Sequence, residues 1–188
     1  MRRGVRLMKG VIGALLLSAP SGGAAVADQS DPMLDELFAA LMNVEDPIAA
    51  AAVEAEVWKR WLASGRDDVD STLSVGMRAM DAGDGRGALR AFDEVVKAAP
   101  GFAEGWNKRA TLYFLLGDHA ASIEDIERTL ELEPRHFGAL SGLALIREAQ
   151  GRPFEALEAL EKVIRIHPRL PQLRERIDHL TRQLGEPI

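Results

Sequence analysis

Three prolines recur at a spacing of 34 residues, at Pro100, Pro134 and Pro168. An amphipathic run with apolar residues three and four apart precedes each one, and proline ends a helix because it lacks a backbone N–H and its ring clashes with the preceding turn. A glycine stands 17 residues before each proline, at Gly83, Gly117 and Gly151. Each unit therefore predicts a helix, a glycine turn, a second helix and a proline stop. Three such units indicate a stacked array of helical hairpins.

The landmarks inside each unit resemble those of the tetratricopeptide repeat family, whose unit is also 34 residues long. The best copy, residues 103–136, carries Trp106, Ala110, Tyr113, Gly117 and Pro134 at the family's offsets. Residues 69–102 and 137–170 form the flanking copies. The resemblance implies an all-α protein, a right-handed α-solenoid in which the first helices of successive hairpins line a concave groove.

The segments on either side of the repeats also predict helices. Residues 28–68 contain two helical runs, roughly 32–43 and 46–63, and Trp58 and Trp61 lie 34 residues before Phe92 and Val95. We therefore expect a degenerate N-terminal hairpin that caps the array, with Trp61 facing Gly76. Residues 171–188 predict one amphipathic helix that caps the other end.

The first 27 residues have the pattern of a cleaved leader. Four basic residues precede the apolar run 11–17, and Ala25-Val26-Ala27 matches the small-x-small motif of signal peptidase sites. We expect cleavage after Ala27, a periplasmic location and no stable membrane insertion afterwards. The alternative is an uncleaved anchor, although the apolar run is shorter than the roughly 20 residues that a bilayer requires.

Composition excludes several classes of function. The 188 residues include no cysteine, which rules out disulfides, thiolate metal sites and cysteine nucleophiles. The formal charge is −6 and becomes −10 once the basic leader is removed, which argues against nucleic acid and anionic lipid as partners. The four histidines show no metal-ligand spacing, and Gly83-Asp84-Gly85 joins two helices rather than a strand and a helix. We therefore expect no enzyme, no cofactor and no metal.

The groove that the resemblance implies is the candidate site. The family's offsets place the following residues in it: Leu73, Met77, Met80, Asp81, Asn107, Thr111, Phe114, Leu115, Ser141, Leu145 and Glu148. Leu115 and Leu145 fit a core position equally well. Methionines and an aromatic side chain favour an extended or helical segment of another protein as the ligand.

Some members of the family hold C-terminal carboxylates in this groove with paired lysine and asparagine residues. The matching positions here are Leu73, Met77, Lys108, Gly138 and Gly142, so that clamp is absent. The sequence thus favours a noncatalytic scaffold or adaptor for an exported protein, in cell-envelope assembly or integrity. The alternative is a periplasmic holdase or assembly factor for cytochrome maturation or a secretion complex. Homo-oligomers are compatible with both.

Overall fold

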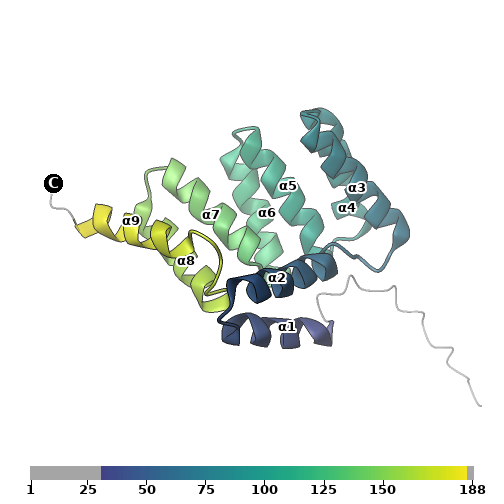
Figure 1. Ribbon diagram of the computed structural model, residues 1–188. Helices are drawn as coiled ribbons and strands as arrows, with labels where there is room; N and C mark the ends of the chain where they lie inside the picture. Colours follow the sequence, from purple (N-terminus) through teal and green to yellow (C-terminus); the bar gives the residue numbers. More distant parts are fainter. Residues whose placement is uncertain (1–30, 186–188) are drawn as a thin grey trace, which may run out of the picture.

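The computed structural model describes residues 31–185, which form nine α-helices and no strand (Figure 1). The leader expected at residues 1–27 lies outside that range. The helices are α1 Pro32–Asn43, α2 Pro47–Trp61, α3 Asp67–Asp81, α4 Gly85–Ala98, α5 Ala103–Leu115, α6 His119–Leu132, α7 Phe137–Ala149, α8 Pro153–Ile166 and α9 Leu173–Gly185. The expected α-solenoid is confirmed. The first repeat begins two residues earlier than its predicted limit at residue 69.

The three repeats are the hairpins α3–α4, α5–α6 and α7–α8. Gly83, Gly117 and Gly151 turn each hairpin at φ angles of 75°, 80° and 68°, a left-handed conformation that strongly favours glycine. In the first two hairpins an aspartate follows the glycine and caps the second helix. The Asp84 carboxylate accepts the Gly87 N–H at 2.9 Å, which fixes the start of α4.

Adjacent hairpins are joined by close packing and by one arginine. Gly105 on α5 lies against Val95 of α4, and Arg109 reaches carboxylates on two neighbouring helices. Its Nη1 donates to Asp93 Oδ1 of α4 at 2.7 Å, and its Nε donates to Asp125 Oδ2 of α6 at 2.7 Å. The hydrogen bonds to Asp125 raise the pKa of Arg109 further above its usual value. This arginine therefore holds the first and second repeats in register.

Helix α9 covers the end of the third repeat, as predicted for a capping helix. Leu173 and Leu180 are buried in one cluster with Leu160 and Val163 of α8. The Arg176 guanidinium also pairs with the Glu148 carboxylate of α7. The apolar face of the last hairpin is thereby removed from water.

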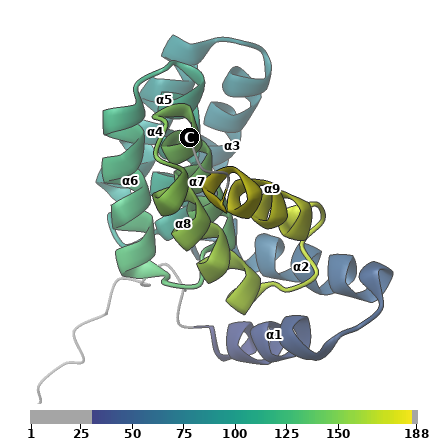
Figure 2. The ribbon, with the colours of Figure 1, turned by 90° about the vertical axis from the view of Figure 1, so that its left-hand side faces the viewer.

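The N-terminal hairpin, α1–α2, has the predicted helices but lies in a different place. Instead of stacking on the first repeat, α2 crosses the end of the array beneath α5 and α7 (Figures 1 and 2). Trp61 does not face Gly76, because the Phe92 ring of α4 fills that space. Its indole packs instead on His136 and Phe137, at the start of α7. The hairpin expected to cap the first repeat thus packs across the second and third repeats instead.

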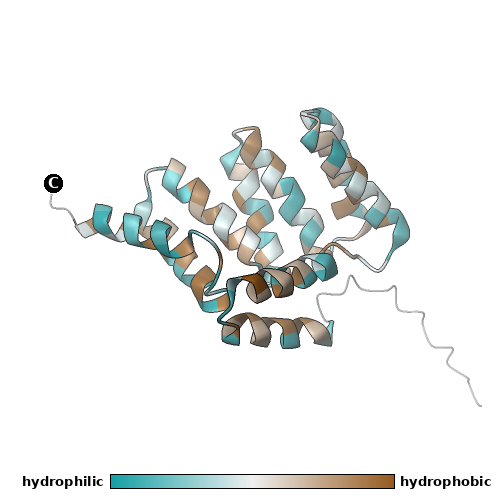
Figure 3. Ribbon diagram, viewed as in Figure 1, coloured by the Kyte–Doolittle hydropathy of each residue, from teal (hydrophilic) through white to brown (hydrophobic). Residues whose placement is uncertain are grey.

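Polar contacts fasten this hairpin to the turns of the second and third repeats. The Arg135 guanidinium donates to Asp35 Oδ1 of α1 at 2.6 Å and lies 4.3 Å from the Phe38 ring centroid. Glu54 of α2 contacts His167 at 3.2 Å between Oε2 and Nε2. Helix α2 is apolar in its first half and carries charged residues in its second half (Figure 3). In contrast, no hairpin between residues 31 and 185 covers the outer face of the first repeat, and Val75 there is 51% exposed.

None of the helices between residues 31 and 185 combines the length and apolar character that crossing a bilayer would require.

Candidate partner-binding site

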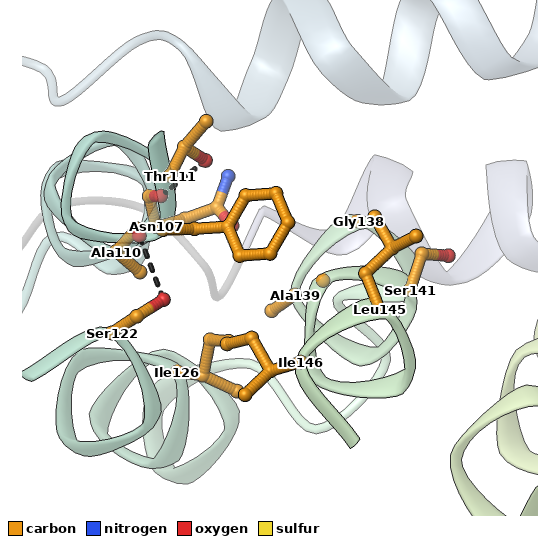
Figure 4. Close-up of a pocket in the computed structure, with 12 residues that line it drawn as sticks. Asn107, Ala110, Thr111, Ser122, Ile126, Gly138, Ala139, Ser141, Leu145 and Ile146 are labelled. Atoms are coloured by element: carbon orange, nitrogen blue, oxygen red, sulfur yellow. Dashed lines mark hydrogen bonds between the residues drawn. The ribbon is translucent and has the colours of Figure 1, made fainter. Parts of the chain in front are cut away.

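A cavity of about 220 Å³ lies between α5 and α7, with α6 as its floor. In Figure 4, Asn107 and Thr111 lie across the opening from Gly138, Ser141 and Leu145. The complete lining is Asn107, Ala110, Thr111, Phe114, Ser122, Ile126, Gly138, Ala139, Ser141, Gly142, Leu145 and Ile146. We refer to it below as the α5–α7 cavity.

Small residues create this space. Gly138 and Gly142 lie one turn apart on α7, so no side chain projects from that part of the wall. A Cβ at Gly142 would meet only Ile126 Cδ1 of α6, at 3.7 Å. On the opposite wall, the half-buried Phe114 ring lies nearly parallel to the His119 ring, with centroids 5.7 Å apart. The aromatic ring and the glycines together leave room for one side chain.

Several polar groups of the lining are already bonded within the protein. Asn107 Nδ2 donates to Glu104 Oε2 at 3.0 Å, Thr111 Oγ1 donates to the Asn107 carbonyl at 2.9 Å, and Ser122 Oγ donates to the Ala110 carbonyl at 2.7 Å. Because these groups are satisfied, the cavity offers mainly apolar contact to a ligand.

Five of the predicted groove residues meet at this cavity: Asn107, Thr111, Phe114, Ser141 and Leu145. Leu145 is 42% exposed, so it is a surface residue and not the core residue that the sequence equally allowed. Leu115 is also exposed, at 63%, but it lies outside the cavity.

The first-repeat residues do not join this site. Leu73 is buried in the core of the first hairpin, and Met77 and Met80 pack against the same cluster. Asp81 is exposed at the end of α3, away from the cavity lining. Glu148 of the third repeat pairs with Arg176 of α9. The predicted groove is therefore reduced to its second and third repeats.

Sequence reasoning treated Gly138 and Gly142 only as missing clamp residues. Their spacing of four positions on one helix was the available signal, because two glycines on one face leave a gap for a ligand or a neighbouring side chain. Nothing in the sequence indicates that Ile126 and Ile146 line the cavity, because both occupy ordinary core positions.

A buried ionic cluster borders the cavity. The Glu104 carboxylate contacts His136 Nε2 at 2.9 Å and Lys108 Nζ at 2.9 Å. Burial alone would raise the pKa of Glu104, but the hydrogen bond from His136 and the positive charge of Lys108 outweigh it and lower that pKa. His136 and His167 are both buried against the N-terminal hairpin, an environment that their spacing did not predict.

No group of three or more His, Asp and Glu side chains that could hold a metal ion occurs within residues 31–185.

A tetratricopeptide repeat family model matches residues 76–128 and 116–171. A TPR repeat-containing protein of Rhizobium etli is 36% identical over 152 residues, which covers 81% of this chain and 74% of the relative. The chain belongs to the tetratricopeptide repeat family.

Solved TPR structures agree with its fold. The first TPR of Spaghetti (RPAP3), bound to the HSP90 peptide SRMEEVD, matches with a TM-score of 0.59 at 19% identity. The match covers 63% of this chain and 94% of the RPAP3 chain. The Sgt2 TPR domain from Aspergillus fumigatus has a TM-score of 0.59 at 24% identity, covering 65% and 87%.

The N-terminal hairpin covers two of the positions at which some TPR proteins hold a carboxylate. Lys108 Nζ lies 5.5 Å from the centroid of the Trp58 ring and is already paired with Glu104. A Cβ at Gly138 would lie 2.7 Å from Trp58 Cη2, so only glycine admits this indole without a shift. In this TPR protein, helix α2 therefore lies over the beginning of the groove and leaves the α5–α7 cavity beside it.

Proposed function

We propose that this chain is a noncatalytic scaffold or adaptor that holds a segment of another exported protein at the α5–α7 cavity. The observation that carries the proposal is the cavity itself, which is apolar, opens between the first helices of two repeats and gathers five of the predicted groove residues. The TPR of RPAP3 holds a peptide, which supports a peptide segment as the ligand class.

The cavity suits one apolar side chain of the partner. Its volume of about 220 Å³ and its satisfied polar groups favour a branched or aromatic residue over a charged one. Lys108 is engaged by Glu104 and lies near the Trp58 ring, so a terminal carboxylate has no free lysine at that position. The partner segment is therefore internal or otherwise independent of its terminal charge.

The leader pattern of residues 1–27 supports a location in the bacterial periplasm, and the role that we propose there is in the assembly or integrity of the cell envelope. Mass spectrometry of the protein recovered from its own cells should find an N-terminus at Asp28. A full-length chain recovered from the membrane fraction would contradict the location.

A crosslinking pair tests the site. The chain has no cysteine, so Leu145→Cys and Leu115→Cys each introduce one unique attachment point for a benzophenone maleimide. Both leucines are exposed on first helices, but only Leu145 lines the cavity. Photolysis of each labelled protein with periplasmic extract should crosslink an exported protein from position 145 and not from position 115. Mass spectrometry then identifies the crosslinked protein.

A cavity-filling variant completes the test. Gly142→Leu in the Leu145→Cys background projects a side chain into the cavity, where the nearest described atom to its Cβ is Ile126 Cδ1 at 3.7 Å. Crosslinking should be lost while the circular-dichroism spectrum stays helical. Equal crosslinking from positions 115 and 145, or crosslinking that survives Gly142→Leu in the folded protein, would show that the partner binds elsewhere.

A further inference from the structure

We propose that the hydrogen bond between Glu104 and His136 sets the width of the α5–α7 cavity, which makes both of them positioning residues for the partner site. This inference rests on the proposed function for its biological meaning. Its structural part, the control of the cavity walls, stands on the contacts of two buried side chains and can be tested without a partner.

On the α5 side, Glu104 is tied to the cavity through Asn107. Its carboxylate is fully buried and accepts Asn107 Nδ2 at 3.0 Å, one turn further along α5. Asn107 is part of the cavity lining. Asn107 Nδ2 and His136 Nε2 both bond to Oε2 of this buried carboxylate, so Glu104 holds Asn107 in one rotamer.

On the α7 side, His136 is tied to the cavity through Ala139. The Ala139 N–H donates to His136 Nδ1 at 3.1 Å, so the imidazole is the cap of α7. Since Nδ1 accepts this bond, the ring proton sits on Nε2 and is donated to Glu104 Oε2 at 2.9 Å. Ala139 also belongs to the cavity lining. One imidazole thus connects the first turn of α5 with the first turn of α7.

The N-terminal hairpin holds the imidazole in this orientation. The Trp61 indole lies on the ring at 4.1 Å between centroids and an interplanar angle of 9°. Trp58 meets the same ring edge-on at 5.6 Å. With its two nitrogens bonded and its face covered, His136 has one available position. The distance between the two cavity walls at this end follows from that position.

The test separates two roles of His136, the capping of α7 and the hydrogen bond to Glu104. His136→Asn keeps an oxygen that can cap α7, because asparagine is a preferred cap residue, but its shorter side chain does not reach Glu104. His167→Asn is the matched control, since His167 is also buried at the hairpin and contacts a glutamate, Glu54, but does not line the cavity. The readout is the methyl NMR spectrum of Ala110, Ala139, Ile126 and Ile146.

His136→Asn should shift these four methyl resonances, whereas His167→Asn should leave them at their wild-type positions. Crosslinking of the partner from position 145 should fall about tenfold in His136→Asn, which corresponds to a loss of about 1.4 kcal/mol. Unchanged cavity methyls in His136→Asn would overturn the inference. Shifted methyls with undiminished crosslinking would uphold the positioning role and contradict the proposed function.

Discussion

Two glycines inside helices, Gly76 and Gly105, mark close approaches between neighbouring helices. A Cβ at Gly76 would lie 2.5 Å from the Phe92 ring, and a Cβ at Gly105 would lie 2.6 Å from a Val95 methyl. Real Cβ atoms do not come this close, so a side chain at either position forces its neighbour to move. The close packing of the helices at these two positions therefore requires a residue without a side chain.

The first prediction follows at Gly76. Gly76→Ala should lower the free energy of unfolding by about 1–3 kcal/mol, because the added methyl displaces the buried Phe92 ring by more than the gain in helix propensity offsets. Gly142→Ala is the matched control, since its Cβ meets Ile126 only at an ordinary contact distance of 3.7 Å. Urea unfolding measures both, and a Gly76→Ala protein as stable as Gly142→Ala would contradict the packing.

The second prediction concerns acid. His136 and Lys108 lower the folded-state pKa of Glu104 below the usual value of a glutamate, 4.5, despite its burial, so its ionised form stabilises the fold above about pH 4.5. This stabilisation should disappear as the pH falls below about 4.5. Melting temperatures across this range should therefore fall more steeply for wild type than for Glu104→Gln. Parallel curves would show that Glu104 carries no such linkage.

The repeat offset predicts which residues share a position but not what surrounds each one. Leu73, Asn107 and Ser141 occupy one offset, and all three were assigned to the groove. In the structure Leu73 is core and only the other two line the cavity. The difference arises from neighbours: Leu73 packs against Val69 and Phe92 within its own hairpin, contacts that a spacing rule does not contain.

At the scale of elements, the N-terminal hairpin departs most from expectation. Amphipathic spacing predicts these two helices, and α1 and α2, capped by Asp31 and Asp46, form nearly where expected. Their placement could not be predicted, because the 34-residue phase of Trp58 and Trp61 fits stacking on α3 just as well. The contacts that decide between the two, such as Trp61 on His136, join residues remote in the sequence.

The third prediction tests that placement. Trp61→Ala should lower the free energy of unfolding by about 3–5 kcal/mol, because Trp61 is fully buried between the hairpin and α7. Limited proteolysis should then cut the linker at residues 62–66 faster than it does in the wild-type protein. Ile48→Ala is the control, since Ile48 is 81% exposed on the same helix. Equal protease resistance of the two variants would contradict the docked position of α2.

The whole molecule is a solenoid in which the first hairpin, α1–α2, packs against the last helices, α7, α8 and α9. Residues of α1 and α2 share one apolar core with α7, α8 and α9, whereas the first repeat has a separate cluster. In an ordinary solenoid each repeat contacts only its neighbours, and stability is a sum over neighbouring interfaces. The packing of the α1–α2 hairpin on the later repeats adds an interface between elements that are not neighbours in the sequence, and a sum over neighbouring repeats does not include it.

The fourth prediction follows from this division of the core. In native-state hydrogen exchange, the amides of α1–α2 should open in the same cooperative step as those of α7–α8. The first repeat, α3–α4, should open separately and at lower free energy, because none of the described helices packs on its outer face. Exchange of α1–α2 together with α3–α4 would place the hairpin on the first repeat instead.

The long-range contacts of the hairpin also constrain the order of folding. Asp35 and Arg135 are 100 residues apart, and Glu54 and His167 are 113 apart. The hairpin is thus synthesised before its docking surface exists, and Trp61 stays uncovered until the third repeat has been made. Contacts of such high contact order form slowly compared with the local contacts of the repeats. Among the helices between residues 31 and 185, the hairpin that is synthesised first is therefore the one that reaches its native position last.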